Sequence, residues 1–142
     1  PSGNLILVHN TFVDRSTIRK LRSRENLYWC LCPRANLHIE NRVPPLDLLT
    51  AEDCRIVIGT DSLASNKSLD ILEELKVLQA YYPEIPLQDL VKWATFNGAM
   101  ALRQENNYGN ISSGKKPGLL LLQDVDLQNM KLLPESRVKR LA

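Results

Sequence analysis

The segment Ile56–Asn66 constrains the fold most, because it joins a run of β-branched residues to a glycine and an aspartate. Ile56–Ile58 is too short for a helix. An apolar run of this kind is typical of a strand buried on both faces, as in parallel sheets. Asp61 follows the carboxyl end of this strand, where ligands and catalytic groups collect in α/β folds. It can bind a metal ion or accept a proton there, although an aspartate after a strand can equally be a turn former or a helix cap.

Two earlier segments have the same form as this strand. Leu5–His9 is an apolar run that ends in a histidine, and Leu27–Cys32 is an apolar run stopped by Pro33. With the strand at Arg55–Gly59 they predict three successive βα units and a parallel sheet. A first strand buried on both faces needs neighbours on both sides, so we expect the chain to be a piece of a longer protein.

Shorter elements are predicted between and after these strands. Ser16 would cap a helix over Thr17–Ser23, and Asn36–Arg42 has the composition of a polar loop. Apolar periodicity predicts helices at Leu46–Leu49, Leu69–Ala80, Leu87–Phe96 and Gly98–Arg103. Glycines then separate short strands at Ile111 and Leu119–Leu122, and Lys131–Ala142 is either a further strand or a loose basic tail.

Composition limits the classes of function. The chain has 142 residues and a net charge of +2, which suits a domain with a real core and gives no reason to expect a nucleic acid or a membrane as partner. The longest apolar stretch, Gly118–Leu122, is far below the ~20 residues that span a bilayer. No secretory signal opens the sequence, so we expect a cytoplasmic protein. Three cysteines make no disulfide framework and are expected to be reduced.

Four stretches carry a resemblance to a known family. They are Leu7-Val8-His9; Cys32–Leu37; Gly59–Ser62 with Ser65-Asn66 and Leu69-Asp70; and Ala94-Thr95 with Asn97–Ala99 and Ala101-Leu102. In these residues the chain resembles the carboxyl-terminal part of the amidohydrolase superfamily, in the branch of cytosine, guanine and aminofutalosine deaminases and triazine chlorohydrolases. A looser match at Gly109–Ile111 and Gly114–Lys116 is similar to the family's return to its small β domain.

The resemblance implies an α/β fold, namely strands six to eight of a (β/α)8 TIM barrel plus a small portion of the flanking β domain. Residues 1–104 would hold the βα units with the helices that follow, and residues 105–142 would return to a small β-sandwich domain. A complete barrel needs about 250 residues. The family's His-x-His pair on strand one and its histidine on strand five have no counterpart here, since the only histidines are His9 and His38.

The same resemblance implies roles for two residues. His9 matches the strand-six histidine that orients the attacking water or the substrate, and Asp61 matches the strand-eight aspartate that binds the metal and the water. The cofactor would be a divalent metal, zinc or iron, in the full-length parent, and the isolated piece need not hold one. Such an ion lowers the pKa of its bound water from 15.7 toward ~7, which suits hydrolysis of a C–N bond (deamination) or a C–Cl bond. His9 can otherwise be a buried histidine satisfied by a backbone carbonyl.

The substrate is expected to be a small molecule, held by Arg34, Asn36 and Ser62 on the loops after the strands. Arg34 stands where many relatives have Ser or Thr, and an arginine can hold a carboxylate or phosphate with two parallel hydrogen bonds. His38 matches no family role. It would lie on the loop after the second strand, as a substrate contact or a plain surface residue.

Two classes of function stay open at the level of sequence. One is a piece of a metal-dependent hydrolase that is inactive by itself, and the other is a metal-free α/β binding module in which His9 and Asp61 are structural. Strands Leu5–His9 and Arg55–Gly59 would leave two apolar sheet edges, which predicts a homo-oligomer. If Leu119–Leu122 or the tail from Lys131 covered an edge instead, the chain would be a monomer.

Overall fold

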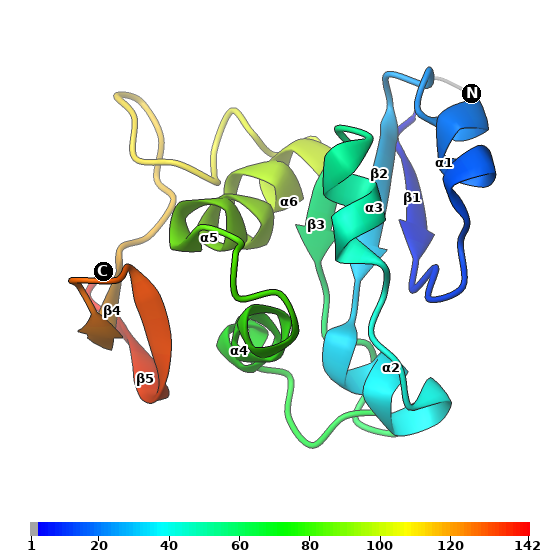
Figure 1. Cartoon of the computed structure of the whole chain (residues 1–142). Coiled ribbons are helices and arrows are strands. Elements are labelled where there is room, and N and C mark those ends of the chain that lie inside the picture. The colour runs from blue at the N-terminus through cyan, green and yellow to red at the C-terminus, as the bar shows by residue number, and fades with distance from the viewer. Residues whose placement is uncertain (1–2) are drawn as a thin grey trace.

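A parallel sheet of three strands lies at the centre of the fold (Figure 1). Its strands, with β2 in the middle, are β1 (Leu5–Val8), β2 (Leu27–Leu31) and β3 (Ile56–Ile58). The computed structural model describes residues 3–142. Val8 aligns with Cys30 and Leu31 aligns with Ile58, so the three carboxyl ends open on the same edge of the sheet. The predicted order of βα units and the parallel sheet are confirmed.

Helices connect the strands and cover the sheet (Figure 1). They are α1 (Arg15–Leu21), α2 (Pro33–Glu40), α3 (Leu46–Ala51), α4 (Ile71–Tyr81), α5 (Leu87–Ala94) and α6 (Phe96–Ala101). An antiparallel hairpin follows, made of β4 (Leu120–Asp126) and β5 (Lys131–Arg140). Within the described residues, no helix has both the length and the apolar character needed to cross a membrane.

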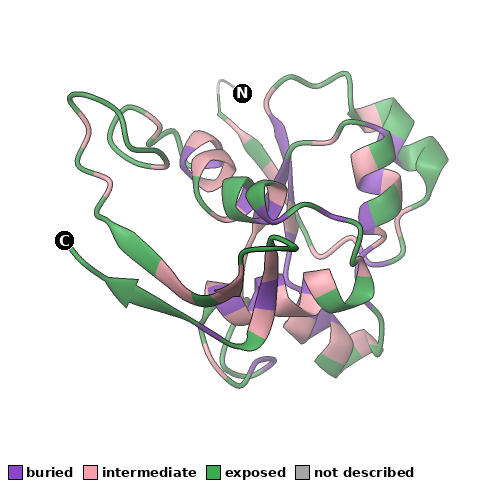
Figure 2. Cartoon of the chain, turned by 60° about the vertical axis from the view of Figure 1, so that its left-hand side comes forward, coloured by how far each residue is buried: buried purple, intermediate pink, exposed green. Residues whose placement is uncertain are grey.

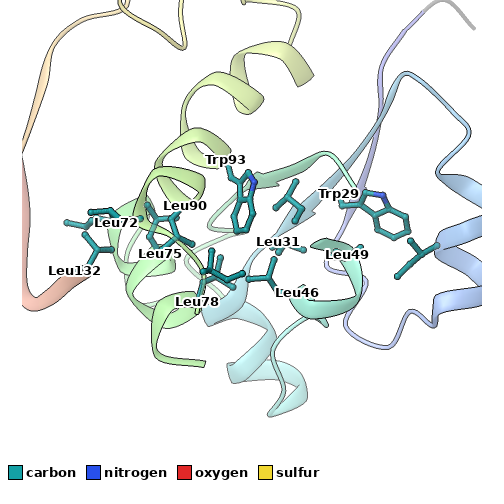
Figure 3. Close-up of a cluster of buried hydrophobic side chains, with 14 of the residues drawn as sticks. Trp29, Leu31, Leu46, Leu49, Leu72, Leu75, Leu78, Leu90, Trp93 and Leu132 are labelled. Atoms are coloured by element: carbon teal, nitrogen blue, oxygen red, sulfur yellow. The ribbon is translucent and has the colours of Figure 1, made fainter. Parts of the chain in front are cut away.

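The main core lies between one face of the sheet and the helices (Figure 3). Trp29 and Leu31 project from β2 toward this side, and Leu78 and Leu90 meet them from α4 and α5 with no exposed surface. Burying a side chain of this size contributes roughly 1.5–3 kcal/mol. The core therefore fixes α4 and α5 against the strands. It also fixes the point where the segment after β3 enters α4.

The opposite face of the sheet is only partly covered. Tyr28 and Val57 pack against Ala101 of α6, and Asn4 Nδ2 donates to the Ala101 carbonyl at 3.0 Å. The outer strand β1 was expected to be buried on both faces, but Val8 is 48% exposed because β1 has one neighbour, β2, in the described chain. Both β1 and β3 are sheet edges here.

The most buried contact between the hairpin and the body of the protein is at Leu132, and Leu122 and Val125 of β4 also pack against the core. Leu132 of β5 is 4% exposed and joins the core beside α4, and its main-chain N–H and C=O both bond the side-chain amide of Gln79, at 2.8 and 2.7 Å. Beyond this contact most of the hairpin is exposed (Figure 2). Residues 131–142 were expected to be a strand or a loose basic tail, and β5 (Lys131–Arg140) shows that most of them form a strand.

Three local expectations are wrong. Asp14, not Ser16, caps α1, since the Asp14 carboxylate accepts the Thr17 N–H at 2.7 Å and also the Ser16 hydroxyl. The predicted loop over residues 36–42 is mostly helix α2, because Pro33 at the first helical position fixes a helical φ and needs no hydrogen bond. Ile111 lies outside the strands of the described chain and is 80% exposed.

A buried carboxylate ties α1 to α3. Glu52 is 4% exposed and accepts hydrogen bonds from three arginines of or next to α1, Arg15 at 3.1 Å, Arg19 at 3.0 Å and Arg22 at 3.1 Å. The Arg19 hydrogen bond is the main cause that lowers the pKa of Glu52 below its ordinary value. The carboxylate is therefore more stable as an anion in the folded protein than in the unfolded chain.

We expect Glu52→Gln to lower the melting temperature at pH 7. A depressed pKa in the folded state contributes stability that is complete above the ordinary glutamate pKa of 4.5 and is lost as the pH falls through the lowered value. The difference from wild type, measured by thermal unfolding, should shrink as the pH falls through this range. Glu135→Gln, at an exposed position, is the control that removes the same charge. An equal difference at pH 7 and pH 3 would contradict the ion-pair account.

Candidate functional site

His9 and Asp61 lie just beyond the carboxyl ends of β1 and β3, at the same edge of the sheet. The main-chain carbonyls of β2 hold both turns, since Cys30 accepts the His9 N–H at 3.0 Å and Leu31 accepts the Gly59 N–H at 2.9 Å. His9 has a φ of 70° and Asp61 a φ of 57°. Left-handed conformations of this kind cost of order 1–3 kcal/mol in non-glycine residues and cluster at functional sites.

The Asp61 side chain is exposed and keeps a negative charge. The Ser65 hydroxyl donates to Asp61 Oδ2 at 2.5 Å and is the main cause that lowers the pKa of this carboxyl. The Ser62 main-chain N–H and the nearby charge of His9 lower it further. An ionised, accessible carboxylate with one oxygen already oriented is suited to binding a cation or taking a proton.

The loop that carries Asp61 is fixed from below by a buried network. Asn66 Nδ2 donates to the Thr60 carbonyl at 2.8 Å and to Glu74 Oε1 at 2.6 Å. Glu74, in the first turn of α4, has no exposed surface, and its Oε2 accepts the Arg34 main-chain N–H at 2.9 Å. Burial raises the pKa of Glu74, and the donors from Arg34 and Asn66 oppose that rise.

The sequence patterns described above do not place Glu74 at this site. A signal existed, because Glu74 falls four residues before Leu78 and therefore on the buried stripe of α4, where a charged residue is unusual unless it is paired. Asn66, which binds it, was noted only as part of the family resemblance.

Asn36, expected to contact substrate, is 2% exposed. Its Nδ2 lies 2.7 Å from Thr11 Oγ1, 3.1 Å from Glu40 Oε2 and 3.3 Å from His9 Nδ1. The Asn36 side chain therefore faces Thr11, Glu40 and His9 rather than open space. Its Oδ1 is one of the buried polar atoms without a partner in the described part of the chain.

The other two expected substrate contacts lie on the Asp61 loop and on α2. Ser62 is exposed, next to Asp61. Arg34, on α2, is half-buried, and its Nη1 donates to Ser68 Oγ at 2.9 Å. His38 is exposed in the last turn of α2, not on a loop as expected.

A pair of thiols lies next to Gly59. Cys30 and Cys32 are free, and the hydrogen bond between them lowers the pKa of Cys30 and raises that of Cys32. A Cβ atom at position 59 would lie 2.9 Å from Cys30 Sγ and 3.3 Å from Cys32 Sγ. A residue with a side chain at position 59 would therefore have to displace the Cys30 thiol.

The donor set for a metal is incomplete within this chain. Across residues 3–142, no group of three or more His, Cys, Asp or Glu side chains is arranged to hold a metal ion. The carboxylate of Asp61 fits the role of a single ligand, because it is ionised and accessible. A catalytic zinc site needs about three protein ligands, so further ligands would have to come from outside these residues.

Comparison with known proteins gives consistent matches. The model of the amidohydrolase family matches residues 1–139. The 5-methylthioadenosine/S-adenosylhomocysteine deaminase of Moorella thermoacetica is 32% identical over 115 residues, which cover 76% of this chain and 26% of that protein. An adenosine deaminase structure from Xanthomonas campestris with bound zinc superposes with a TM-score of 0.72 at 28% identity, over 82% of this chain and 28% of that one.

A more distant structural match shows the fold alone. Atrazine chlorohydrolase from Arthrobacter aurescens TC1, complexed with zinc, gives a TM-score of 0.68 at 18% identity, over 78% of this chain and 26% of that one. In each case this chain spans little more than a quarter of the matched protein.

We expect Glu74→Ala to destabilise the protein by about 2 kcal/mol or more. The change leaves the buried donors of Asn66 and Arg34 unpaired, and each such donor costs about 1–3 kcal/mol. Glu73→Ala, one residue earlier, removes the same charge from the same helix turn but breaks only the partly exposed Lys76 ion pair. It should cost less than about 1 kcal/mol. Urea denaturation measures both, and equal losses would contradict the buried network.

Proposed function

This chain belongs to the amidohydrolase family, and from that premise we propose that it forms the carboxyl-terminal part of a metal-dependent deaminase. Its three parallel strands would be strands six to eight of a (β/α)8 barrel. In such barrels the active site lies at the carboxyl ends of the strands, which is the edge where His9 and Asp61 are found. Residues 1–104 would complete the barrel, and residues 105–142 would join a flanking β domain.

The accessible, ionised carboxylate of Asp61 carries the proposal. Asp61 would provide one ligand to a divalent ion, zinc or iron, and would also accept a proton from the attacking water and deliver it to the leaving amine. When bound, the ion supplies the Lewis acidity that makes a water molecule nucleophilic near neutral pH. The Ser65 hydroxyl keeps the carboxylate oriented for both roles.

His9 would stabilise the charge that develops on the substrate, with its ring oriented through Asn36. Ser62, exposed beside Asp61, would contact the substrate directly, and so would Arg34 of α2. Asn36 would act as a positioning residue.

Deamination is favoured over cleavage of a C–Cl bond. The matches at 28% and 32% identity are named deaminases, whereas the chlorohydrolase match at 18% identity concerns the fold alone. The substrate would be a small heterocycle or nucleoside that carries an exocyclic amine. Family membership also argues against a metal-free binding module as the whole protein's role.

We expect the 142-residue chain to show no deamination of 5-methylthioadenosine above a zinc-only blank, because it provides a single clear metal ligand. The product of the complete coding sequence should be active, and Asp61→Asn in it should lower kcat by about 10²-fold or more. Asp53→Asn is a matched control, since Asp53 is also exposed and left-handed (φ 53°) but lies before β3, at the other end of the strand. Full activity of Asp61→Asn would contradict the proposal.

We propose that the isolated chain self-associates through the edges of β1 and β3. Each strand pairs only with β2 among the described residues, and Leu5 and Val8 of β1 are 40% and 48% exposed. The edge of β1 is the more open of the two, since Asn97 Nδ2 donates to the Ile56 carbonyl of β3 at 2.8 Å. Unpaired apolar edges are templates for strand pairing. Light scattering at high micromolar concentration should show a dimer or larger species, and a monodisperse monomer would exclude edge-driven assembly.

A further inference from the structure

A cavity of about 390 Å³ lies between α2 and the segment that joins β3 to α4. Three basic side chains line it, Arg34 and His38 from α2 and Lys67 from the segment, and its lining includes no carboxylate. The volume falls within the range of small-molecule sites, about 300–1,000 Å³.

One of the basic groups in this cavity, Arg34, is held in place by a hydrogen bond. The Ser68 hydroxyl fixes Arg34 Nη1 at 2.9 Å, which leaves the remaining N–H groups of the guanidinium fork to bind a ligand. Glu74 and Asp61 are nearby acids. Both oxygens of Glu74 accept bonds from the network beneath the cavity, from Asn66 and from the Arg34 main chain, and the Asp61 carboxylate accepts the Ser65 hydroxyl. The lining of the cavity itself contains basic groups and no carboxylate.

Part of the cavity wall is apolar. Leu37, Leu63 and Val77 line it beside the basic groups, and Leu63 is 65% exposed. A ligand that suits both surfaces combines an oxyanion, which arginine binds through two parallel hydrogen bonds, with an apolar group.

The position in the fold supports an anion site. The two segments that build the cavity follow the adjacent parallel strands β2 and β3 on the chain (Figure 1). Barrels of parallel strands frequently bind phosphate at the loops after their last two strands. If β2 and β3 are the last two strands of a barrel, as proposed above, the cavity lies where such barrels bind phosphate. Its basic side chains are suited to binding an anion.

We propose that this cavity binds a small organic phosphate or carboxylate that carries an apolar group, with Arg34, His38 and Lys67 as the anion contacts. Binding here is separate from the hydrolytic role of Asp61 and requires no metal. The two sites share Arg34, which is also proposed above as a substrate contact, and Ser65, which lines the cavity and donates its hydroxyl to Asp61. A ligand bound in the cavity would therefore affect the hydrogen bond between Ser65 and the Asp61 carboxylate.

The test is titration of the labelled chain with phenyl phosphate, benzoate and inorganic phosphate, followed by NMR. We expect phenyl phosphate or benzoate to shift the amide signals of residues 34–38 and 63–68, and the affinity to fall as salt is added. Arg34→Gln and Lys67→Gln should each weaken binding about tenfold, the loss expected for one charge-assisted hydrogen bond. Lys67 is exposed, so its replacement spares the fold.

Two further variants sharpen the result. Leu63→Ser should weaken phenyl phosphate more than inorganic phosphate, because it removes part of the apolar wall. Lys92→Gln, at an exposed position on α5, removes the same charge away from the cavity and should leave binding unchanged. Comparison of phenyl phosphate with benzoate identifies the preferred oxyanion. Absence of binding up to about 10 mM, or equal affinity in Lys67→Gln and Lys92→Gln, would overturn the proposal.

Discussion

The organisation of this edge of the protein depends on one buried carboxylate, that of Glu74. A charged group without exposed surface is costly unless donors surround it, and here the donors come from two distant parts of the chain, Asn66 and the Arg34 main chain. The need to satisfy one charge therefore fastens the segment after β3 to the beginning of α2. Asp61 lies on that fastened segment and the basic cavity is lined by it, so their relative position is set by the same interaction.

The sheet adds a second constraint. At the carboxyl end of β2, the carbonyls of Cys30 and Leu31 accept hydrogen bonds from the His9 and Gly59 N–H groups of the two flanking turns. The residues on these turns, His9 and Asp61, both adopt left-handed backbone conformations. Such conformations persist only where surrounding contacts over-determine them. The strands, which are packed against the helices, supply the rigidity that these two turns require.

The strands and the place of Asp61 could be predicted from sequence, because short apolar runs with a following polar residue are a local pattern. The parts that could not be predicted depend on tertiary contacts. Residues 36–42 have the polarity of a loop, but Pro33 and the burial of Ala35 and Asn36 against the core make most of them helical. The contact between Asn36 and His9 joins residues that are far apart on the chain, and no rule of sequence spacing predicts such a contact.

The side-chain amide of Gln79 occupies main-chain groups at the free edge of β5. It accepts the Leu132 N–H and donates to the Leu132 carbonyl, which are the groups that a third strand would use to pair with β5. A side chain of α4 thus imitates one residue of a neighbouring strand and occupies the free edge of the hairpin where it leaves the core. The Gln79 amide therefore blocks the addition of another strand at the base of the hairpin, beside Lys131 and Pro134 of β5, two residue types that also oppose strand addition.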